Sequence, residues 1–195
     1  VNNLCFGDST GSLEAMAQGG WGNYQYSLTG STWDALASFS ALASGNYYVK
    51  VRDSLLCYDS VLISITQPAD IVIQEITSLH RNVLCNNSNT GQTGIIVSGG
   101  SPDYEYSIDK LSWDTIPLFE NLYANDYNIW VRDTDQCYDS ILIAITQPSA
   151  IAIQEITSFH EDVLCYGDST GQIQVSASGG TSGYEYSDNK ITWSV

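Results

Sequence analysis

Positive charge is scarce in this chain. Its 195 residues include six Lys and Arg against 22 Asp and Glu, which gives a net charge of −16. A chain this acidic repels phosphate backbones and anionic lipid surfaces, so we expect it to bind neither nucleic acid nor membranes. The acidity suits cations, basic partners or solubility alone.

Long apolar runs are also missing. No run approaches the roughly 20 residues needed to cross a bilayer, and Val1–Leu4 lacks the basic and apolar regions of a signal peptide. We therefore expect no membrane insertion by these residues, and any export signal to lie outside them.

The residues of common catalytic and metal sites are sparse. There are two histidines, no C-x-x-C pair and no phosphate-binding glycine loop, which argues against zinc and nucleotide sites. His80 and His160 are 80 residues apart, but no nucleophilic residue recurs with them. We expect both to be loop residues, and the protein not to be an enzyme.

An 80-residue internal repeat dominates what is present. Asp53–Leu79 and Asp133–Phe159 are identical at 18 of 27 positions without a gap. The same spacing separates three sets of residues: Cys5, Cys85 and Cys165; Trp33, Trp113 and Trp193; and the Gly-Gly pairs at 19, 99 and 179. We predict a first repeat at 1–68 that lacks its first strand, a complete second repeat at 69–148, and a third at 149–195 that is truncated at its C-terminal end.

Within a repeat the hydrophobic pattern is that of β-strands. Leu13, Ala15 and Ala17 alternate with polar or exposed-type residues, as do Val49 and Val51 and their counterparts 80 residues on, and Gly, Asn, Asp and Ser separate such runs. For Ala35–Ala43 the alternatives are a short helical turn and a loop that sends Phe39 and Leu42 into the core, and we expect the loop. Tyr24, Tyr26 and their counterparts at 104, 106, 184 and 186 are expected to point inward.

Six or seven short strands in about 80 residues favour a two-sheet sandwich. Tyr47 and Tyr127 each follow a Leu-x-x-Gly/Asn-x turn and open a strand, which resembles the tyrosine corner of immunoglobulin-like domains. We predict an all-β chain of tandem immunoglobulin-like (PKD- or fibronectin-like) sandwiches arranged end to end. The Thr-Gln-Pro ends at Pro68 and Pro148 predict short, stiff joints.

The cysteines are expected to form disulfides, which implies an oxidising, exported setting. We predict pairing within a repeat, Cys5–Cys57 and Cys85–Cys137, with Cys165 unpaired. In an ordinary immunoglobulin-like topology, however, Cys85 and Cys137 lie at opposite ends of the sandwich. Pairing between neighbouring repeats, such as Cys5–Cys137, and free thiols therefore stay open as alternatives.

Several short motifs together resemble a known family. Cys5-x-Gly-Asp-Ser-Thr-Gly, repeated at Cys165, precedes a Gly-Gly pair, Tyr-x-Tyr-Ser, Leu-x-x-Gly-x-Tyr-x-Val-x-Val-x-Asp and a second cysteine. This order resembles the SprB-type repeat of Bacteroidetes surface adhesins, although Cys85-Asn-Asn-Ser departs from it. The resemblance implies type IX secretion, a cell-surface location and a role in adhesion or gliding motility.

Bacteroidetes O-glycosylation uses Asp-Ser/Thr followed by an aliphatic residue, Met or Thr. Six hydroxyl residues fit this pattern: Ser9, Ser54, Ser60, Thr115, Ser140 and Ser169. The alternative is that Asp-Ser and Asp-Thr simply start turns.

Two further features concern ligands. Asp133, Asp135 and Asp139 are weak calcium candidates, against the alternative of a solvated acidic loop; no other cofactor is expected. Trp130 alternates with Ile129 and Val131 and is expected to face outward. The alternatives for its role are a cap on a neighbouring repeat, an isolated contact, and a stacking surface for a sugar.

These observations favour a structural stalk or filament of a large secreted cell-surface adhesin. Its partners would be the neighbouring repeats and, at the surface, a polysaccharide or protein ligand. The alternative is an adhesin module with a glycan or protein site in each repeat.

Overall fold

A computed structural model describes residues 1–194, and residue 195, the last of the predicted third repeat, lies outside the described residues. The described residues form two compact units. The first comprises Val1–Gln74, Ile96–Pro117 and Ile129–Ile141, and the second comprises Glu75–Ile95, Leu118–Asn128 and the described residues from Leu142 onward. The fold is all-β, and its helical turns are the short 3-10 segments η1 (Thr77–Leu79) and η2 (Thr157–Phe159). Within residues 1–194 no helix has the length and apolar content to span a membrane.

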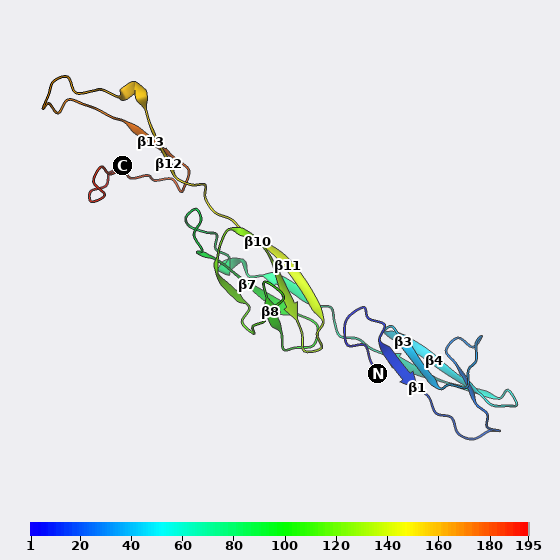
Figure 1. Ribbon diagram of the computed structural model, residues 1–195. Coiled ribbons are helices and arrows are strands. Elements are labelled where there is room, and N and C mark those ends of the chain that lie inside the picture. The colour runs from blue at the N-terminus through cyan, green and yellow to red at the C-terminus, as the bar shows by residue number, and fades with distance from the viewer. Residues whose placement is uncertain (195) are drawn as a thin grey trace. The chain divides into compact units, whose positions relative to one another are not determined.

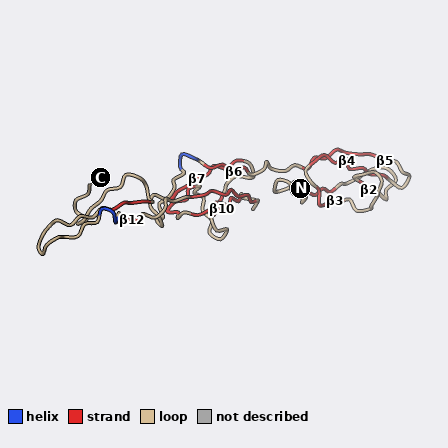
Figure 2. The backbone as a smooth tube through the Cα atoms, turned by 90° about the horizontal axis from the view of Figure 1, so that it is seen from above, coloured by secondary structure: helices blue, strands red, loops and turns tan. Residues whose placement is uncertain are grey.

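The first repeat forms two antiparallel sheets (Figure 1). One sheet pairs β1 (Gly11–Glu14) with β3 (Ser38–Leu42), and the other has the order β2 (Gln25–Ser27), β4 (Gly45–Arg52), β5 (Tyr58–Ile65). In Figure 2, β4 and β5 run side by side. Leu13 and Leu42 from the first sheet pack with Val49 and Ile65 from the second. The predicted sandwich is therefore confirmed, with its core between the sheets.

The second repeat has the same two sheets and adds one strand. Its sheets have the orders β6 (Val72–Glu75), β7 (Gly91–Ser98), β9 (Leu118–Leu122) and β8 (Glu105–Ser107), β10 (Asn125–Arg132), β11 (Tyr138–Ile145). In the third repeat, β12 (Ala152–Glu155) pairs with β13 (Val175–Ser178). The strand predicted directly after each proline is present as β6 and β12.

Buried positions recur with the 80-residue period. The counterparts of the four core residues of the first repeat are Thr93, Leu122, Ile129 and Ile145, and all four are buried. Alternation along β10 is complete, because Ile129 and Val131 have no exposed surface while Trp130 between them is half-buried. The inward strand register and the outward Trp130 are confirmed.

The segment expected to be a loop at Ala35–Ala43 contains strand β3, so that expectation was wrong. Ala41 has φ 57°, and the pairing with β1 shifts between Gly11 and Leu13. This irregularity is a β-bulge, which places Phe39 and Leu42 on the same side although they are three residues apart. The bulge interrupts the alternation of inward and outward residues, so the sequence pattern did not indicate a strand. Strand β9 has the same irregularity, with Asn121 at φ 58°.

Both predicted tyrosine corners are present. The Tyr47 hydroxyl donates to the Ala43 carbonyl at 2.9 Å, and the Tyr127 hydroxyl donates to the Tyr123 carbonyl at 3.1 Å. A second recurring bond escaped the sequence analysis: in each repeat the first tyrosine of Tyr-x-Tyr donates to the carbonyl of the first glycine of the Gly-Gly pair. None of the six tyrosines is fully exposed: Tyr24, Tyr26, Tyr104, Tyr106, Tyr184 and Tyr186.

Removing the first tyrosine corner should destabilise the first repeat. Tyr47→Phe deletes the hydrogen bond to Ala43, and we expect a loss of about 1 kcal/mol in the free energy of unfolding. The adjacent Tyr48→Phe is the control, because Tyr48 is 57% exposed and should change stability by less than about 0.5 kcal/mol. Urea unfolding measures both, and equal effects would contradict the role of the corner.

The histidines follow the 3-10 turns, as expected of loop residues. His80 Nδ1 lies 2.6 Å from Glu75 Oε1, and Thr93 Oγ1 donates to the same oxygen at 2.8 Å. The hydrogen bond to Glu75 raises the pKa of His80 above its ordinary 6.5, outweighing partial burial, and Asn82 adds to the rise. Glu155 and then Asp162 raise the pKa of His160 in the same way.

This arrangement predicts a pH dependence of stability. A histidine whose pKa is raised on folding stabilises the fold below its unfolded pKa near 6.5, and that stabilisation is lost as pH rises through the folded pKa. The free energy of unfolding should therefore fall as pH rises above about 6.5. The double variant His80→Gln/His160→Gln should lose this slope, and an unchanged slope would refute the assignment.

Candidate functional site

The segment around Cys5 is fastened to the end of strand β5. The Asn3 side-chain carbonyl accepts the backbone N–H groups of Thr10 at 2.8 Å and Gly11 at 2.5 Å, and the Asn3 backbone N–H donates to Thr66 at 3.0 Å. Gln67, just before Pro68, accepts the Gly7 N–H at 3.0 Å. The cysteine turn is thus held at the end of the first repeat from which the chain continues into the second.

The second repeat keeps this turn although its sequence differs. Asn87 stands at the position of Gly7 and adopts φ 60°, against 77° for the glycine. Asparagine tolerates this left-handed conformation better than other side chains. Its N–H donates to Gln147 at 2.8 Å, as Gly7 does to Gln67. The departure Cys85-Asn-Asn-Ser therefore preserves the geometry.

The linker after each proline lies against the Gly-Gly pair of the repeat that it enters. Gly100 N–H donates to Ala69 at 2.9 Å, and Gly180 N–H donates to Ser149 at 2.8 Å. A Cβ at Gly99 would lie 1.7 Å from the Asp70 carbonyl oxygen, and one at Gly179 would lie 2.0 Å from that of Ala150. Only glycine allows this approach in the second and third repeats.

A buried aspartate organises the turn that faces this linker in the second repeat. One carboxylate oxygen of Asp133 accepts the N–H groups of Asp135 at 3.0 Å and Cys137 at 2.9 Å, and the other accepts the Ser101 N–H at 2.8 Å. Asp133 is 1% exposed. It therefore ties the residue after the Gly-Gly pair to the cysteine that directly precedes β11.

Asp53 makes the equivalent bonds in the first repeat, to Leu55, Cys57 and Trp21. Desolvation alone would raise the pKa of the Asp53 carboxyl. The backbone N–H groups that it accepts outweigh this effect, and its pKa lies below the ordinary value. The carboxylate thus stays ionised in its structural role.

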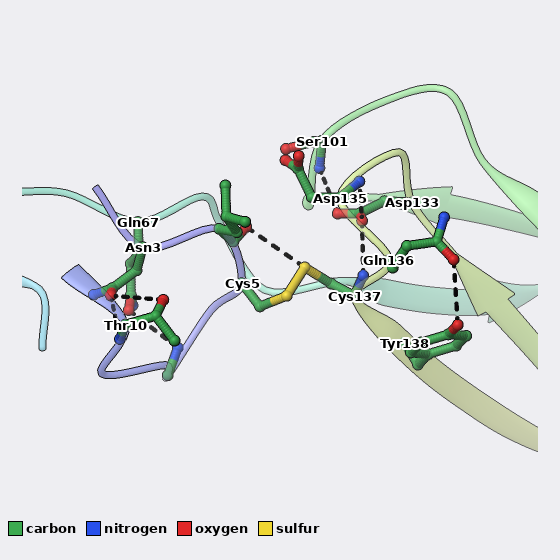
Figure 3. Close-up of a disulfide and its surroundings, with 12 residues drawn as sticks. Asn3, Cys5, Thr10, Gln67, Ser101, Asp133, Asp135, Gln136, Cys137 and Tyr138 are labelled. Carbon is green, nitrogen blue, oxygen red and sulfur yellow. Dashed lines mark hydrogen bonds between the residues drawn. A yellow bond between two sulfur atoms is a disulfide. The ribbon is translucent and has the colours of Figure 1, made fainter. Parts of the chain in front are cut away.

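A disulfide joins Cys5 to Cys137, with the Cα atoms 5.5 Å apart (Figure 3). The carbonyl oxygen of Leu4 lies 3.5 Å from Cys137 Sγ. The predicted pairs Cys5–Cys57 and Cys85–Cys137 are not formed, and Cys57 and Cys85 are free and exposed, as is Cys165. The physical reason is the topology: the two cysteines of a repeat lie at opposite ends of its sandwich, so the partner within reach belongs to the adjacent repeat.

A cavity of about 320 Å³ lies beside the disulfide. Its walls come from both repeats and from the linker, and they include Phe6, Pro68, Ile71, Gln136 and Tyr138. Joining these segments covalently closes a loop with a sequence separation of 132 residues. In the chain-entropy model such a loop contributes about 5 kcal/mol by restricting the unfolded chain.

The structure does not support calcium at Asp133, Asp135 and Asp139. The Asp133 oxygens point at backbone N–H groups, which a cation would have to displace, and the Asp139 carboxylate accepts the Ser140 N–H. Among residues 1–194 no three His, Cys, Asp or Glu side chains gather in a way that suits a metal ion. Asp135 and Asp139 are exposed, as expected of the alternative to calcium binding, a solvated acidic loop.

The six candidate glycosylation residues are accessible. Ser140 is half-buried, and the other five are exposed: Ser9, Ser54, Ser60, Thr115 and Ser169. Asp59, Asp114 and Asp139 each accept the N–H of the following hydroxyl residue. This is the turn-forming role of Asp-Ser and Asp-Thr, and glycosylation of the six hydroxyl groups stays a prediction.

The aspartate at the joint gives a sharp test of this site. Asp133→Ala leaves the buried N–H groups of Ser101 and Cys137 without acceptors, and we expect it to cost at least about 2 kcal/mol in the free energy of unfolding. Asp135→Ala, in the same turn but exposed, should cost less than about 0.5 kcal/mol. Chemical denaturation under non-reducing conditions measures both. Similar values for the two variants would show that the carboxylate does not organise the joint.

Two solved structures resemble the chain. The C-terminal 282-residue fragment of intimin, solved with the intimin-binding domain of the translocated intimin receptor, is 14% identical over 63% of this chain, with a TM-score of 0.33. The chain covers 46% of that fragment, less than half of its length. Three N-terminal domains of the highly immunogenic outer capsid protein of bacteriophage RB49 are 12% identical over 99% of this chain and 76% of theirs, with a TM-score of 0.42.

No curated protein matches the chain. The family model described as the SprB repeat matches three times, at residues 1–32, 80–112 and 157–189. These matches begin at or just before the three cysteine turns and extend through the Gly-Gly pairs and the Tyr-x-Tyr strands, which are the features that recur in the structure. SprB repeats are typical of cell-surface proteins of the adhesin type. The chain belongs to the SprB repeat family.

Proposed function

We propose that this chain is a load-bearing stalk segment of a large secreted adhesin that acts in adhesion or gliding motility. The observation that carries the proposal is the Cys5–Cys137 disulfide, which fastens the first repeat to the second. A flexible linker between independent binding modules needs no such bond. In a stalk that transmits force from a surface contact to the cell, such a bond keeps the two repeats from being pulled apart at their joint.

Further features of the joint support a mechanical role. The carbonyl groups of Ala69 and Ser149 accept hydrogen bonds from the following Gly-Gly pairs, and Gln67 and Gln147 accept hydrogen bonds from the cysteine turns. The same local bonds therefore occur on the way into the second and the third repeat. Repeated units joined alike produce a regular filament.

The remaining cysteines are placed to form the same kind of disulfide at other joints between repeats. Cys85 and Cys165 occupy the position of Cys5, and Cys57 occupies that of Cys137. Where another repeat adjoins, the geometry of Cys5–Cys137 pairs the first cysteine of one repeat with the second cysteine of the next. In a longer array every joint would then carry one disulfide.

Export and modification belong to the same proposal. Disulfide staples require an oxidising compartment, which suits type IX secretion to the cell surface. The exposed Asp-Ser and Asp-Thr sites suit an O-glycosylated filament. The role is structural and adhesive, with no catalytic step.

Pulling the chain by its two ends tests the stalk. With Cys5–Cys137 formed, the 132-residue separation cannot extend, so the fully unfolded oxidised chain should be shorter than the reduced chain by about 450 Å at roughly 3.4 Å per residue. Single-molecule force spectroscopy resolves this difference. Cys5→Ser should abolish it, since the variant cannot form the staple.

The double variant Cys57→Ser/Cys85→Ser is the matched control. It removes two exposed thiols and should keep the full difference in length between oxidised and reduced chains. If the double variant loses the difference instead, pairing lies within the repeats and the stapled stalk is refuted.

A further inference from the structure

Most of the positive charge of this acidic chain lies on or beside the three-stranded sheets that contain β4 and β10. Lys50, Arg52, Lys110 and Arg132 are four of its six Lys and Arg. Lys50 and Arg52 lie on β4, Arg132 lies on β10, and Lys110 follows β8. In the first repeat, cross-strand pairing sets Lys50 opposite Ser60 and Arg52 opposite Tyr58, so these four side chains share one face of the sheet.

An open cavity of about 400 Å³ occupies this face in the first repeat. Its walls are Gly30, Trp33, Lys50, Arg52, Leu56, Tyr58 and Ser60. The Arg52 guanidinium carbon lies 4.4 Å from the centroid of Trp33, and the Trp33 indole N–H donates to Gly30 at 3.1 Å. Arg52 is thereby held over the indole ring, while Tyr58 is 80% exposed.

The charges of this cavity are not compensated within the protein. Arg52 Nε donates to the neutral amide oxygen of Gln25 at 2.9 Å. No ion pair in residues 1–194 involves Lys50 or Arg52. The terminal N–H groups of Arg52 and the Lys50 ammonium are therefore available to an anion, in a chain whose net charge is −16.

The same face of the second repeat is filled by its own side chains. Glu105 replaces Gln25 and pairs with Arg132 at 2.5 Å. Trp130 replaces Lys50, and Lys110, which replaces Gly30, places its ammonium 3.2 Å from the centroid of Trp130. Trp113 is covered by Arg132 at 4.3 Å. Three substitutions thus replace the unpaired cations of the first repeat with an Arg132–Glu105 ion pair and a lysine that lies over Trp130.

We propose that the cavity of the first repeat binds an acidic saccharide, with Lys50 and Arg52 on its carboxylate and the exposed ring of Tyr58 against its sugar face. Arg presents a planar fork that matches a carboxylate. Flat aromatic surfaces beside a few convergent polar groups are typical of a ligand pocket of this volume. The negative charge of the rest of the chain repels dense polyanions and favours a ligand with few charges.

This site adds a lateral contact to the stalk and does not depend on it. Titration with trigalacturonate, followed by isothermal calorimetry and tryptophan fluorescence, should show binding at millimolar or lower concentration. The neutral trisaccharide of galactose should bind at least about tenfold more weakly, because it lacks the charge-assisted hydrogen bonds. Equal binding of the two sugars, or none by the acidic one, would overturn the proposal.

Variants locate the binding. Arg52→Gln and Lys50→Gln should each reduce affinity for trigalacturonate about tenfold. Gln25→Glu should reduce it as well, because it gives Arg52 a carboxylate partner as in the second repeat, and it removes no cation. Arg132→Gln, on the same face of the second repeat, is the matched control and should bind like the unmodified chain. Loss with Arg132→Gln but not with the other three would place binding elsewhere and refute the site.

A peptide of four glutamates separates the saccharide from an acidic protein ligand. It carries more carboxylates but no sugar ring, and we expect it to bind more weakly than trigalacturonate. Tighter binding of the peptide would overturn the assignment to a saccharide. Because Cys5→Ser leaves the cavity residues in place, it should bind trigalacturonate normally, which keeps this test separate from that of the stalk.

Discussion

The buried carboxylate of Asp133 is the interaction on which the joint depends. It accepts the N–H groups of Ser101 and Cys137 at once, so it fixes the loop that receives the linker and the cysteine that is stapled to Cys5. The linker approaches so closely that a side chain at Gly99 would overlap the Asp70 carbonyl. One buried side chain with three backbone partners thus holds together the loop that meets the linker and the cysteine of the disulfide.

Much of the fold could be predicted because the same hydrophobic alternation occurs in more than one repeat. Alternation at Val49 and Val51 and the turn before Tyr47 predicted strand β4 and its tyrosine corner, and Ile129 and Val131 repeat the result. Strand β3 was missed because a bulge at Ala41 puts Phe39 and Leu42 on one side at a spacing of three. Local irregularity of this kind is set by pairing with β1, which no period in the sequence reveals.

The candidate site was predictable only in part. The regular 80-residue spacing of the cysteines indicated a structural role. Spacing alone favours the partner nearer in sequence, whereas the pairing of Cys5 with Cys137 depends on which ends of two sandwiches meet. The aspartates that suggested calcium are turn-forming residues, since Asp133 needs its oxygens for backbone N–H groups. The open cavity around Trp33 depends on the absence of side chains at Gly30 and of charge at Gln25, and such features become visible only when cross-strand neighbours are known.

The Cys5–Cys137 disulfide should make the first repeat and the nearest end of the second repeat move as one body. Backbone ¹⁵N relaxation by NMR reports this motion for amides on β4 and on β8 separately. In the oxidised chain both sets should give the same rotational diffusion, and Cys5→Ser should increase the independent motion of the two. Independent tumbling of β4 and β8 in the oxidised chain, with Cys5–Cys137 intact, would contradict a load-bearing stalk.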